Sequence, residues 1–423
     1  MSKRLCVGVA IANMGMTIGM TMGMMSLASA QDAAPAAVAA AECTGQGSFS
    51  KAISKQLGAA QDAVKARKYE DIVAKVDEAA AVDKPKTEFD EFWIHRFRGN
   101  AYAGLKQFDK AVQEFEVISD SPCLKQEEKA EHFKIITRIY GQMENYPKVV
   151  EYGNRVLQLG PDPDVSSWVG QSAYLNKDFA GARRVLTELI EPQIQQDKQP
   201  DEQNLRLYQS SCTQLKDDAC SLQQFERLVK YYPKPEHWQN TIILLSRDPK
   251  STDKQQLNII RLATYLDVLK DGQTYCEDAQ IAIDQGLPGE AQWLLEKGME
   301  QKLFNDARLA DRAKRLLAEA KQAVANDKST LAQQDAAARA NKAGNADVKI
   351  GAAYLTYGEH AKAIEALQRG IAKGGVKDAA EANLMLGIAY LRSGNKPEAA
   401  KAFQAVNGDA LTTRLARLWL LNT

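Results

Sequence analysis

The chain has 423 residues, with 54 basic and 54 acidic side chains and only 7% aromatic residues. No stretch alternates apolar and polar residues as a half-buried strand does, so the composition favours an all-α fold. The balanced charge includes no polybasic tail or stripe, which argues against nucleic acid as a partner because such binding depends on neutralised phosphates.

Residues 1–30 are typical of a secretory signal peptide. Lys3 and Arg4 precede an apolar segment, 5–27, and the small residues Ala-Ser-Ala follow it. We expect cleavage near Ala30 and secretion across the inner membrane into the periplasm. A membrane anchor is the alternative, because the apolar run is longer than a usual signal core.

The segment 31–47 is an Ala-rich leader that we expect to be disordered. Removal of Lys3 and Arg4 would lower the basic count from 54 to 52, against 54 acidic residues, so a strong electrostatic attachment to anionic lipid is disfavoured. No later stretch is apolar for long enough to span a bilayer. We therefore expect no transmembrane segment in the mature chain, which leaves peripheral association with the envelope open.

One spacing recurs along the rest of the chain. A small residue is followed by a tyrosine at offset 3, an alanine at offset 12 and a large apolar residue at offset 16. The clearest copies are Gly99, Tyr102, Ala111, Phe115; Gly351, Tyr354, Ala363, Leu367; and Gly387, Tyr390, Ala399, Phe403. Weaker copies begin at Ala60, Thr137, Gly170, Gln209 and Ala279. These offsets suit a helix hairpin, in which the small residue lets the second helix approach closely.

The pattern resembles the tetratricopeptide repeat, whose template is Trp-x2-Leu-Gly-x2-Tyr, then Ala-x3-Phe, then Pro. The resemblance implies one α-solenoid superhelix of stacked antiparallel helix hairpins over 48–423, with about eight to ten hairpins. The strongest repeats are 92–122, 126–161, 345–374 and 381–409. The template Trp is replaced by His95, Phe133 or Asn383 in individual copies.

Two gaps between copies are each wide enough for one divergent hairpin. The first gap contains 235–247 and 252–269, and the second of these segments opens with the capping box Thr252-x-x-Gln255. The second gap contains 306–342, a run rich in Ala, Lys and Arg with high helix propensity. The final helix, 411–421, is typical of the capping helix that such arrays need over the last open face.

The cysteines suggest a disulfide-permissive compartment. Cys212 and Cys220 are expected on the two antiparallel helices of one hairpin, close to its turn, where a disulfide would constrain the unfolded chain. Cys43 precedes the first hairpin and Cys123 lies in the loop that closes the second, so these two can also form a bridge along one edge of the solenoid. Cys276 is left over and is expected to be a small buried apolar residue.

The sequence shows no pattern of an enzyme. Its four histidines lie in separate repeats without a His-x3-His or Cys-x2-Cys partner, so we predict no metal site. A Gly-x-Ser-x-Gly motif and a phosphate-binding Gly-rich loop are absent, and we predict no catalytic residue and no cofactor. The acidic residues Glu88, Asp90 and Glu91 suit the start of a helix.

The resemblance also implies that the first helix of each hairpin lines a concave face. The candidate partner-binding residues are Arg96, Asn100, Lys134, Arg138 and Gln171 in the N-terminal half, and Val348, Leu355, Leu384, Ile388 and Leu391 in the C-terminal half. The first set resembles the clamp by which some members hold a peptide carboxylate, although Ile135 stands where an amide would be expected. A plain solvated face could explain the first set, and coverage by the terminal helix could explain the second.

Three classes of function remain open. The leading hypothesis is a non-enzymatic periplasmic scaffold or adaptor that binds protein or peptide segments and serves cell-envelope assembly or organisation. The alternative is a cell-wall-acting enzyme, or an activator of one, that is built on a helical superhelix. A small-molecule receptor that uses the same concavity is a third possibility.

Overall fold

The computed structural model describes residues 42–423, of which Cys43–Thr423 form one compact unit. The predicted signal peptide, 1–30, and most of the predicted leader lie outside the described residues. Every regular element in the described part is helical, which confirms the all-α class. None of the helices described there is both long and apolar enough for a membrane crossing.

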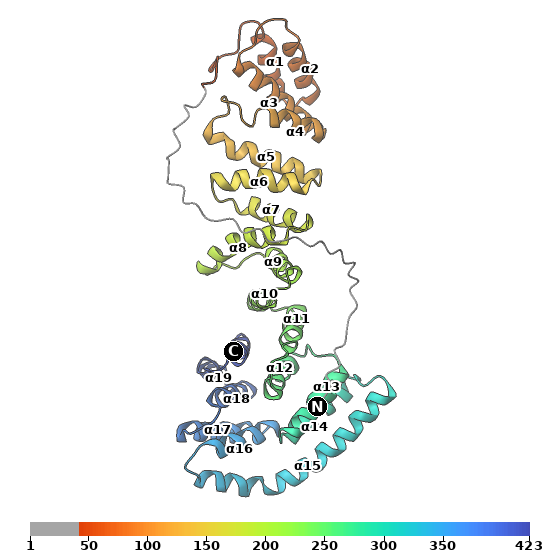
Figure 1. Cartoon of the computed structure of the whole chain (residues 1–423), viewed down its shortest axis with the longest axis vertical. Coiled ribbons are helices and arrows are strands. Elements are labelled where there is room, and N and C mark those ends of the chain that lie inside the picture. The colour runs from red at the N-terminus through yellow and green to blue at the C-terminus, as the bar shows by residue number, and fades with distance from the viewer. Residues whose placement is uncertain (1–41) are drawn as a thin grey trace, which may run out of the picture. The chain divides into compact units, whose positions relative to one another are not determined.

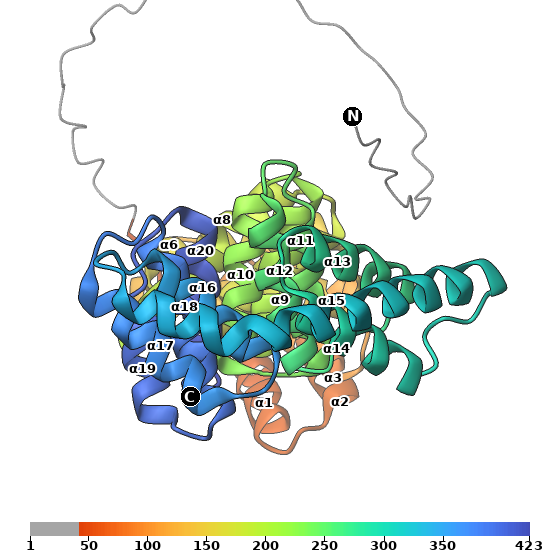
Figure 2. The same cartoon turned by 90° about the horizontal axis from the view of Figure 1, so that it is seen from below.

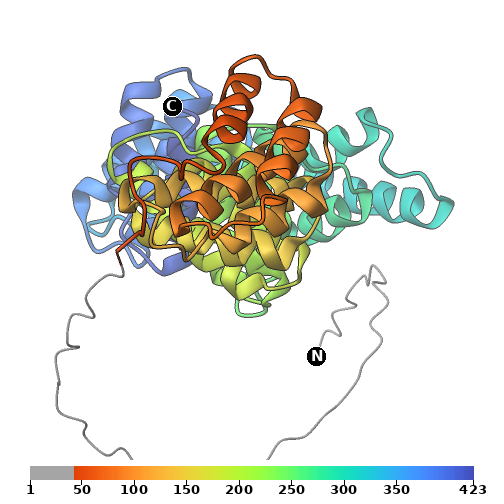
Figure 3. The ribbon, with the colours of Figure 1, turned by 90° about the horizontal axis from the view of Figure 1, so that it is seen from above.

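Helices pair in chain order, and each pair stacks on the next (Figure 1). The nine pairs of the described part are α1 (Ser54–Lys65) with α2 (Tyr69–Ala80), α3 (Glu88–Gly104) with α4 (Phe108–Val117), α5 (Lys129–Gln142) with α6 (Tyr146–Leu159), α7 (Pro163–Leu175) with α8 (Phe179–Gln195), α9 (Glu202–Gln214) with α10 (Asp218–Tyr231), α11 (Pro235–Ser246) with α12 (Asp253–Tyr265), α13 (Gly272–Asp284) with α14 (Pro288–Glu300), α16 (Asn345–Thr356) with α17 (His360–Lys373), and α18 (Ala379–Arg392) with α19 (Lys396–Gln404). Figure 3 looks onto the first pairs, coloured red to orange. The predicted α-solenoid is therefore confirmed.

The recurrent spacing corresponds to a close contact inside each hairpin. A Cβ atom at Gly99 would lie 3.0 Å from the ring of Phe115, and one at Gly387 would clash with the ring of Phe403. Ala399, which faces this crossing from the second helix, has no exposed surface. The small residue thus makes room for the large apolar residue sixteen positions later.

The two gaps of the repeat pattern have different structures. The first holds the predicted divergent hairpin, α11 and α12, and Thr252 and Gln255 form the predicted capping box. The second gap does not hold a hairpin: α15 (Ala307–Ala340) is one continuous helix of 34 residues. It contains neither Gly nor Pro and is rich in Ala, so nothing in the sequence ends the helix midway.

Helix α15 connects two parts of the hydrophobic core. Ala313 and Ala320 belong to a cluster with residues of α13 and α14, whereas Leu331 and Ala338 belong to the cluster of α16 to α20. Figures 1 and 2 show it running from α13 and α14 to the C-terminal hairpins. A single helix therefore sets the distance between α14 and α16.

The C-terminal hairpins pack against α12. Helix α20 (Ala410–Leu420), the predicted capping helix, contacts both α18 and α12. Its Trp419 is fully buried, stacks on Phe403 of α19 and lies against Tyr265 of α12. On the same side, Lys254 forms an ion pair with Asp378 at 3.1 Å. The segment from α12 to α20 is therefore closed on itself rather than open at its end.

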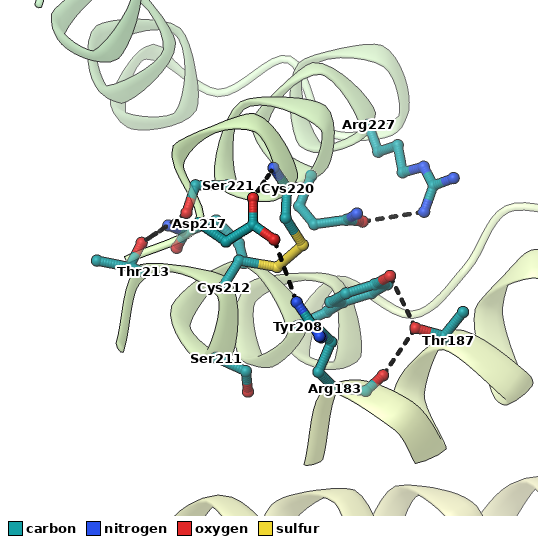
Figure 4. The surroundings of a disulfide bond; sticks show 12 residues. Arg183, Thr187, Tyr208, Ser211, Cys212, Thr213, Asp217, Cys220, Ser221 and Arg227 are labelled. Atoms are coloured by element: carbon teal, nitrogen blue, oxygen red, sulfur yellow. Dashed lines mark hydrogen bonds and ion pairs between the residues drawn. A yellow bond between two sulfur atoms is a disulfide. The ribbon is translucent and has the colours of Figure 1, made fainter. Parts of the chain in front are cut away.

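Both predicted cysteine pairs lie at disulfide distance. The sulfur atoms of Cys43 and Cys123 are 1.93 Å apart, and those of Cys212 and Cys220 are 1.95 Å apart. Figure 4 shows the second pair beside Asp217, which caps α10. Cys276 is buried and unbridged within the described part of the chain.

The end of the predicted leader, 43–47, forms turns next to α3. The backbone N–H of Thr44 donates to Oε2 of Glu88 at 2.9 Å, and the Cys43–Cys123 bridge fixes the same segment. Asp90, which is fully buried, accepts the backbone N–H groups of Ser50 and Thr87. Burial opposes ionisation of Asp90, but these hydrogen bonds outweigh it and lower the pKa of the carboxyl.

A substitution at the hairpin crossing tests its tight packing. We expect Gly387→Ala to destabilise the protein by about 1–3 kcal/mol, because the new methyl group meets the Phe403 ring. Gly58→Ala in α1 is the matched control, since no heavy atom outside its own helix lies within 4 Å of a Cβ placed there. The control should stabilise by about 0.5–1 kcal/mol. Urea unfolding followed by circular dichroism measures both, and equal effects would contradict the packing argument.

Removal of the two disulfides should have unequal effects. Cys43 and Cys123 are separated by 80 residues, whereas Cys212 and Cys220 are separated by 8. The chain-entropy argument predicts a loss of about 4–5 kcal/mol for Cys43→Ser with Cys123→Ser, and of about 2–3 kcal/mol for the other pair. Urea unfolding of the two double variants measures the difference. A larger loss from the short loop would show that the bridges act on the native state instead.

Candidate functional site

The predicted N-terminal residues lie on the first helices of three successive hairpins. Asn100 of α3, Arg138 of α5 and Gln171 of α7 each follow the residue that opens the repeat spacing, and all three are exposed. Arg96 and Lys134 lie one turn earlier on α3 and α5 and are half-buried. We call these five residues the polar stripe.

Two cations of the polar stripe connect neighbouring hairpins. Arg96 donates to Glu128 at 2.7 Å, just before α5, and Lys134 donates to Asp162 at 2.6 Å, at the start of α7. The guanidinium of Arg96 also lies 5.1 Å from the ring centroid of Trp93. These two side chains therefore already have partners within the fold.

The other three residues of the polar stripe are exposed, and their side chains form no ion pair or hydrogen bond with other described residues. The guanidinium of Arg138 lies 5.7 Å from the ring centroid of Trp168, and no carboxylate of the described residues forms an ion pair with it. Asn100 and Gln171 flank it at the equivalent positions of the adjacent hairpins. The open part of the polar stripe offers one cation and two amides.

The predicted C-terminal residues are mostly buried. Leu384 and Ile388 have no exposed surface, Leu355 and Leu391 are 5% and 6% exposed, and Val348 is half-buried. They belong to the core that α12 and α20 share with α16 and α18. Coverage by neighbouring helices therefore accounts for Leu384 and Leu391, whereas Leu355 and Ile388 line a cavity.

That cavity, which we call the C-terminal pocket, has a volume of about 480 Å³. Its walls come from α12, α14, α16, α18, the turn between α16 and α17, and the first residue of α17. Besides Leu355 and Ile388, the residues that define its chemistry are Arg261, Tyr265, Glu290, Trp293, His360 and Arg392. The helices that meet here are distant in the sequence and are brought together by the packing of α18 and α20 on α12.

A buried ionic network forms one wall of the C-terminal pocket. Arg261 donates through Nε and Nη2 to the two carboxylate oxygens of Glu290 at 2.7 and 2.6 Å. Its Nη1 lies 3.4 Å from Glu381 of α18, which also accepts Asn258 at 2.6 Å. Burial raises the pKa of Glu381 despite the opposing effect of Arg261. The network joins α12, α14 and α18.

A second cation on the pocket wall has no such partner. No carboxylate of the described residues forms an ion pair with Arg392, whose guanidinium lies 5.8 Å from the ring centroid of Trp293. Burial lowers the pKa of Arg392, partly offset by the charge of Glu290. Nδ1 of His360 is also buried without a hydrogen-bond partner. Burial and the charge of Arg392 lower the pKa of His360, which favours its neutral ring.

Within the described residues, one cluster has metal-binding side-chain types: Glu202, Glu236 and His237. Both carboxylate oxygens of Glu202 accept the ammonium of Lys234, at 2.7 and 2.6 Å, and Nε2 of His237 lies 2.8 Å from one of them. A lysine therefore already provides the positive charge that a metal ion would supply.

Stacked helix hairpins of this kind define an α-solenoid repeat protein, a fold that presents an extended concave surface. A family model described as tetratricopeptide repeat matches residues 381–407, which cover most of α18 and α19. The family model thus matches the last of the repeats that the spacing predicted. No curated protein matches the sequence.

Several solved structures of tetratricopeptide-repeat proteins are similar to parts of the chain. The TPR2AB domain of yeast Sti1, in a complex with pHSP90, is 15% identical over 64% of this chain and 98% of that one, with a TM-score of 0.35. The C-terminal part of a repeat protein from Cytophaga hutchinsonii is 14% identical over 77% and 98%, with a TM-score of 0.30. A repeat protein from Parabacteroides merdae is 10% identical over 78% and 99%, with a TM-score of 0.27. With scores this low, none of them informs the site.

The ionic network can be tested by removing its only cation. We expect Arg261→Met to destabilise the protein by about 3–5 kcal/mol, because Glu290 and Glu381 would remain buried without their partner. Lys254→Met, which breaks an ion pair between exposed side chains, should cost less than about 1 kcal/mol. Thermal and urea unfolding measure both variants. A small effect of Arg261→Met would show that the network adds little to the contact between α12 and α18.

Proposed function

We propose that the chain is a non-enzymatic scaffold or adaptor in the periplasm that binds protein or peptide segments along the polar stripe. The observation that carries this proposal is the open set of Asn100, Arg138 and Gln171, which occupies one register on three successive first helices. The three side chains recur once per hairpin, so an extended segment that runs along the array can contact one of them at each hairpin.

The chemistry of the polar stripe favours a polar segment with at least one acidic group. The amides of Asn100 and Gln171 can donate to and accept from the main chain of a partner. Arg138 presents a planar guanidinium that Trp168 holds in place, so less side-chain entropy is lost when it binds a carboxylate. Arginine and tryptophan are also the residue types that most often dominate binding energies.

The periplasmic assignment and a role in cell-envelope assembly or organisation belong to the same proposal. Two cysteine pairs at disulfide distance support an oxidising compartment. The signal-peptide pattern of residues 1–30 supports the same compartment from the sequence. An array of hairpins that offers surface rather than reactive groups fits an adaptor.

Binding along the polar stripe can be tested with a triple variant. We expect Asn100→Ala, Arg138→Ala and Gln171→Ala together to lower the recovery of envelope proteins in a pull-down by about tenfold or more. The side chains are exposed, so the fold should be retained. Arg184→Ala is the matched control, because that arginine is exposed on α8 and pairs only within its own helix.

Unchanged recovery with the triple variant would contradict the proposal. Equal losses with Arg184→Ala would assign the effect to general surface charge. Incubation of the wild-type chain with purified peptidoglycan tests the alternative, since soluble muropeptide products would support a wall-acting enzyme instead.

A further inference from the structure

We propose that the C-terminal pocket binds a small organic carboxylate with an aromatic or alkyl body, and that Arg392 receives the carboxylate. The inference is independent of the polar stripe, which lies on other hairpins. It rests on three observations: the size of the pocket, the fact that only one of its two arginines forms ion pairs, and the aromatic side chains around the other arginine.

The two arginines of the pocket differ in their partners. Arg261 has several partners, since Glu290 accepts from its Nε and Nη2, and Asn258 and Glu381 accept from its Nη1. Arg392 has no carboxylate partner among the described residues, and Glu290, the acid whose charge it feels, is already bound bidentately by Arg261. Among the described residues, Arg392 is thus the arginine of the pocket wall that has no carboxylate at ion-pair distance. A bound carboxylate would supply that partner.

Arg392 is the last residue of α18, and the helix dipole explains its position there only in part. A cation near a helix C-terminus is favoured by the helix dipole, but this effect needs no burial. Arg392 is only half-buried, yet the part of the side chain that is withdrawn from water still costs free energy that a fully exposed side chain would avoid. A carboxylate that forms charge-assisted hydrogen bonds with it would recover that cost.

The rest of the wall suits an apolar body. Trp293 and Tyr265 are each 40% exposed, and both line the pocket. Leu355 and Ile388 lie in the same wall. His360 also lines the wall, and its Nδ1 is buried without a hydrogen-bond partner among the described residues.

The volume favours a small molecule over a protein segment. About 480 Å³ lies within the range of about 300–1,000 Å³ that small-molecule sites occupy, and such sites combine apolar walls with a few polar groups. A helix is about 10–12 Å in diameter, so this volume would hold only about one turn of it. We therefore assign the pocket to a compound of low molecular mass.

The probes are phenylbutyrate and its uncharged amide, titrated into the full mature chain by calorimetry. We expect phenylbutyrate to bind one site with a Kd on the order of 0.1–1 mM. The affinity of the amide should be lower by about tenfold or more. Arg392→Gln should weaken phenylbutyrate to the level of the amide. Arg138→Gln, which removes an exposed guanidinium that also lies over a tryptophan, should leave both affinities unchanged.

Fluorescence locates the bound probe without relying on Arg392. Binding should change the tryptophan emission of the wild type, and Trp293→Phe should remove that change while leaving calorimetric binding detectable. Equal affinities for acid and amide, unchanged binding by Arg392→Gln, or a fluorescence change that survives Trp293→Phe would each overturn the assignment. A short peptide that binds through its free C-terminal carboxylate more tightly than phenylbutyrate would also overturn the assignment. The pocket would then recognise the end of a protein chain rather than a compound of low molecular mass.

Discussion

The close approach of two helices at one small residue is the constraint on which the rest of the structure depends. Gly351 against Leu367 and Gly387 against Phe403 leave no room for a Cβ atom, and Gly99 against Phe115 leaves barely enough. No hairpin of such an array buries its surface alone, so each crossing fixes the surface that the next hairpin packs on. The crossing also fixes the rotation of each first helix, because the residue after the glycine lies about 100° further round the helix. The register of both candidate sites follows from this contact.

Closure between α12 and α20 is the second constraint, and it depends on α15. An α15 broken into a hairpin would add another layer to the stack, whereas one continuous helix spans the cores of α13–α14 and α16–α20. The C-terminal hairpins then contact α12, where Asn258, Arg261 and Glu381 form hydrogen bonds among themselves. Buried ion pairs of this kind add little net stability but penalise arrangements that leave one partner unpaired. The network therefore favours one docking of α18 on α12.

The repeat spacing made the hairpins predictable because it records contacts between residues sixteen positions apart. The same holds for α12, whose capping box is a contact over three residues. Closure was not predictable, since Asn258 and Glu381 are 123 positions apart and neither belongs to a motif. For the same reason the sequence pointed to Leu355 and Ile388 but not to Trp293 or Arg392, which reach the pocket from other helices. In α15 the composition predicted helix correctly, but weak periodicity could not distinguish one helix from two.

The two candidate sites use one register of the fold in two environments. Asn100 follows Gly99 in the N-terminal half, and Ala352 and Ile388 follow Gly351 and Gly387 in the C-terminal half. Where no distant helix covers this position, the side chain is polar and exposed; where α12 and α14 meet α16 and α18, it is apolar and lines a pocket. Because the repeat register is shared, the difference lies in the side chain at this position and in the helices that cover it. Closure thus places a pocket at a register that stays an exposed surface in the N-terminal half.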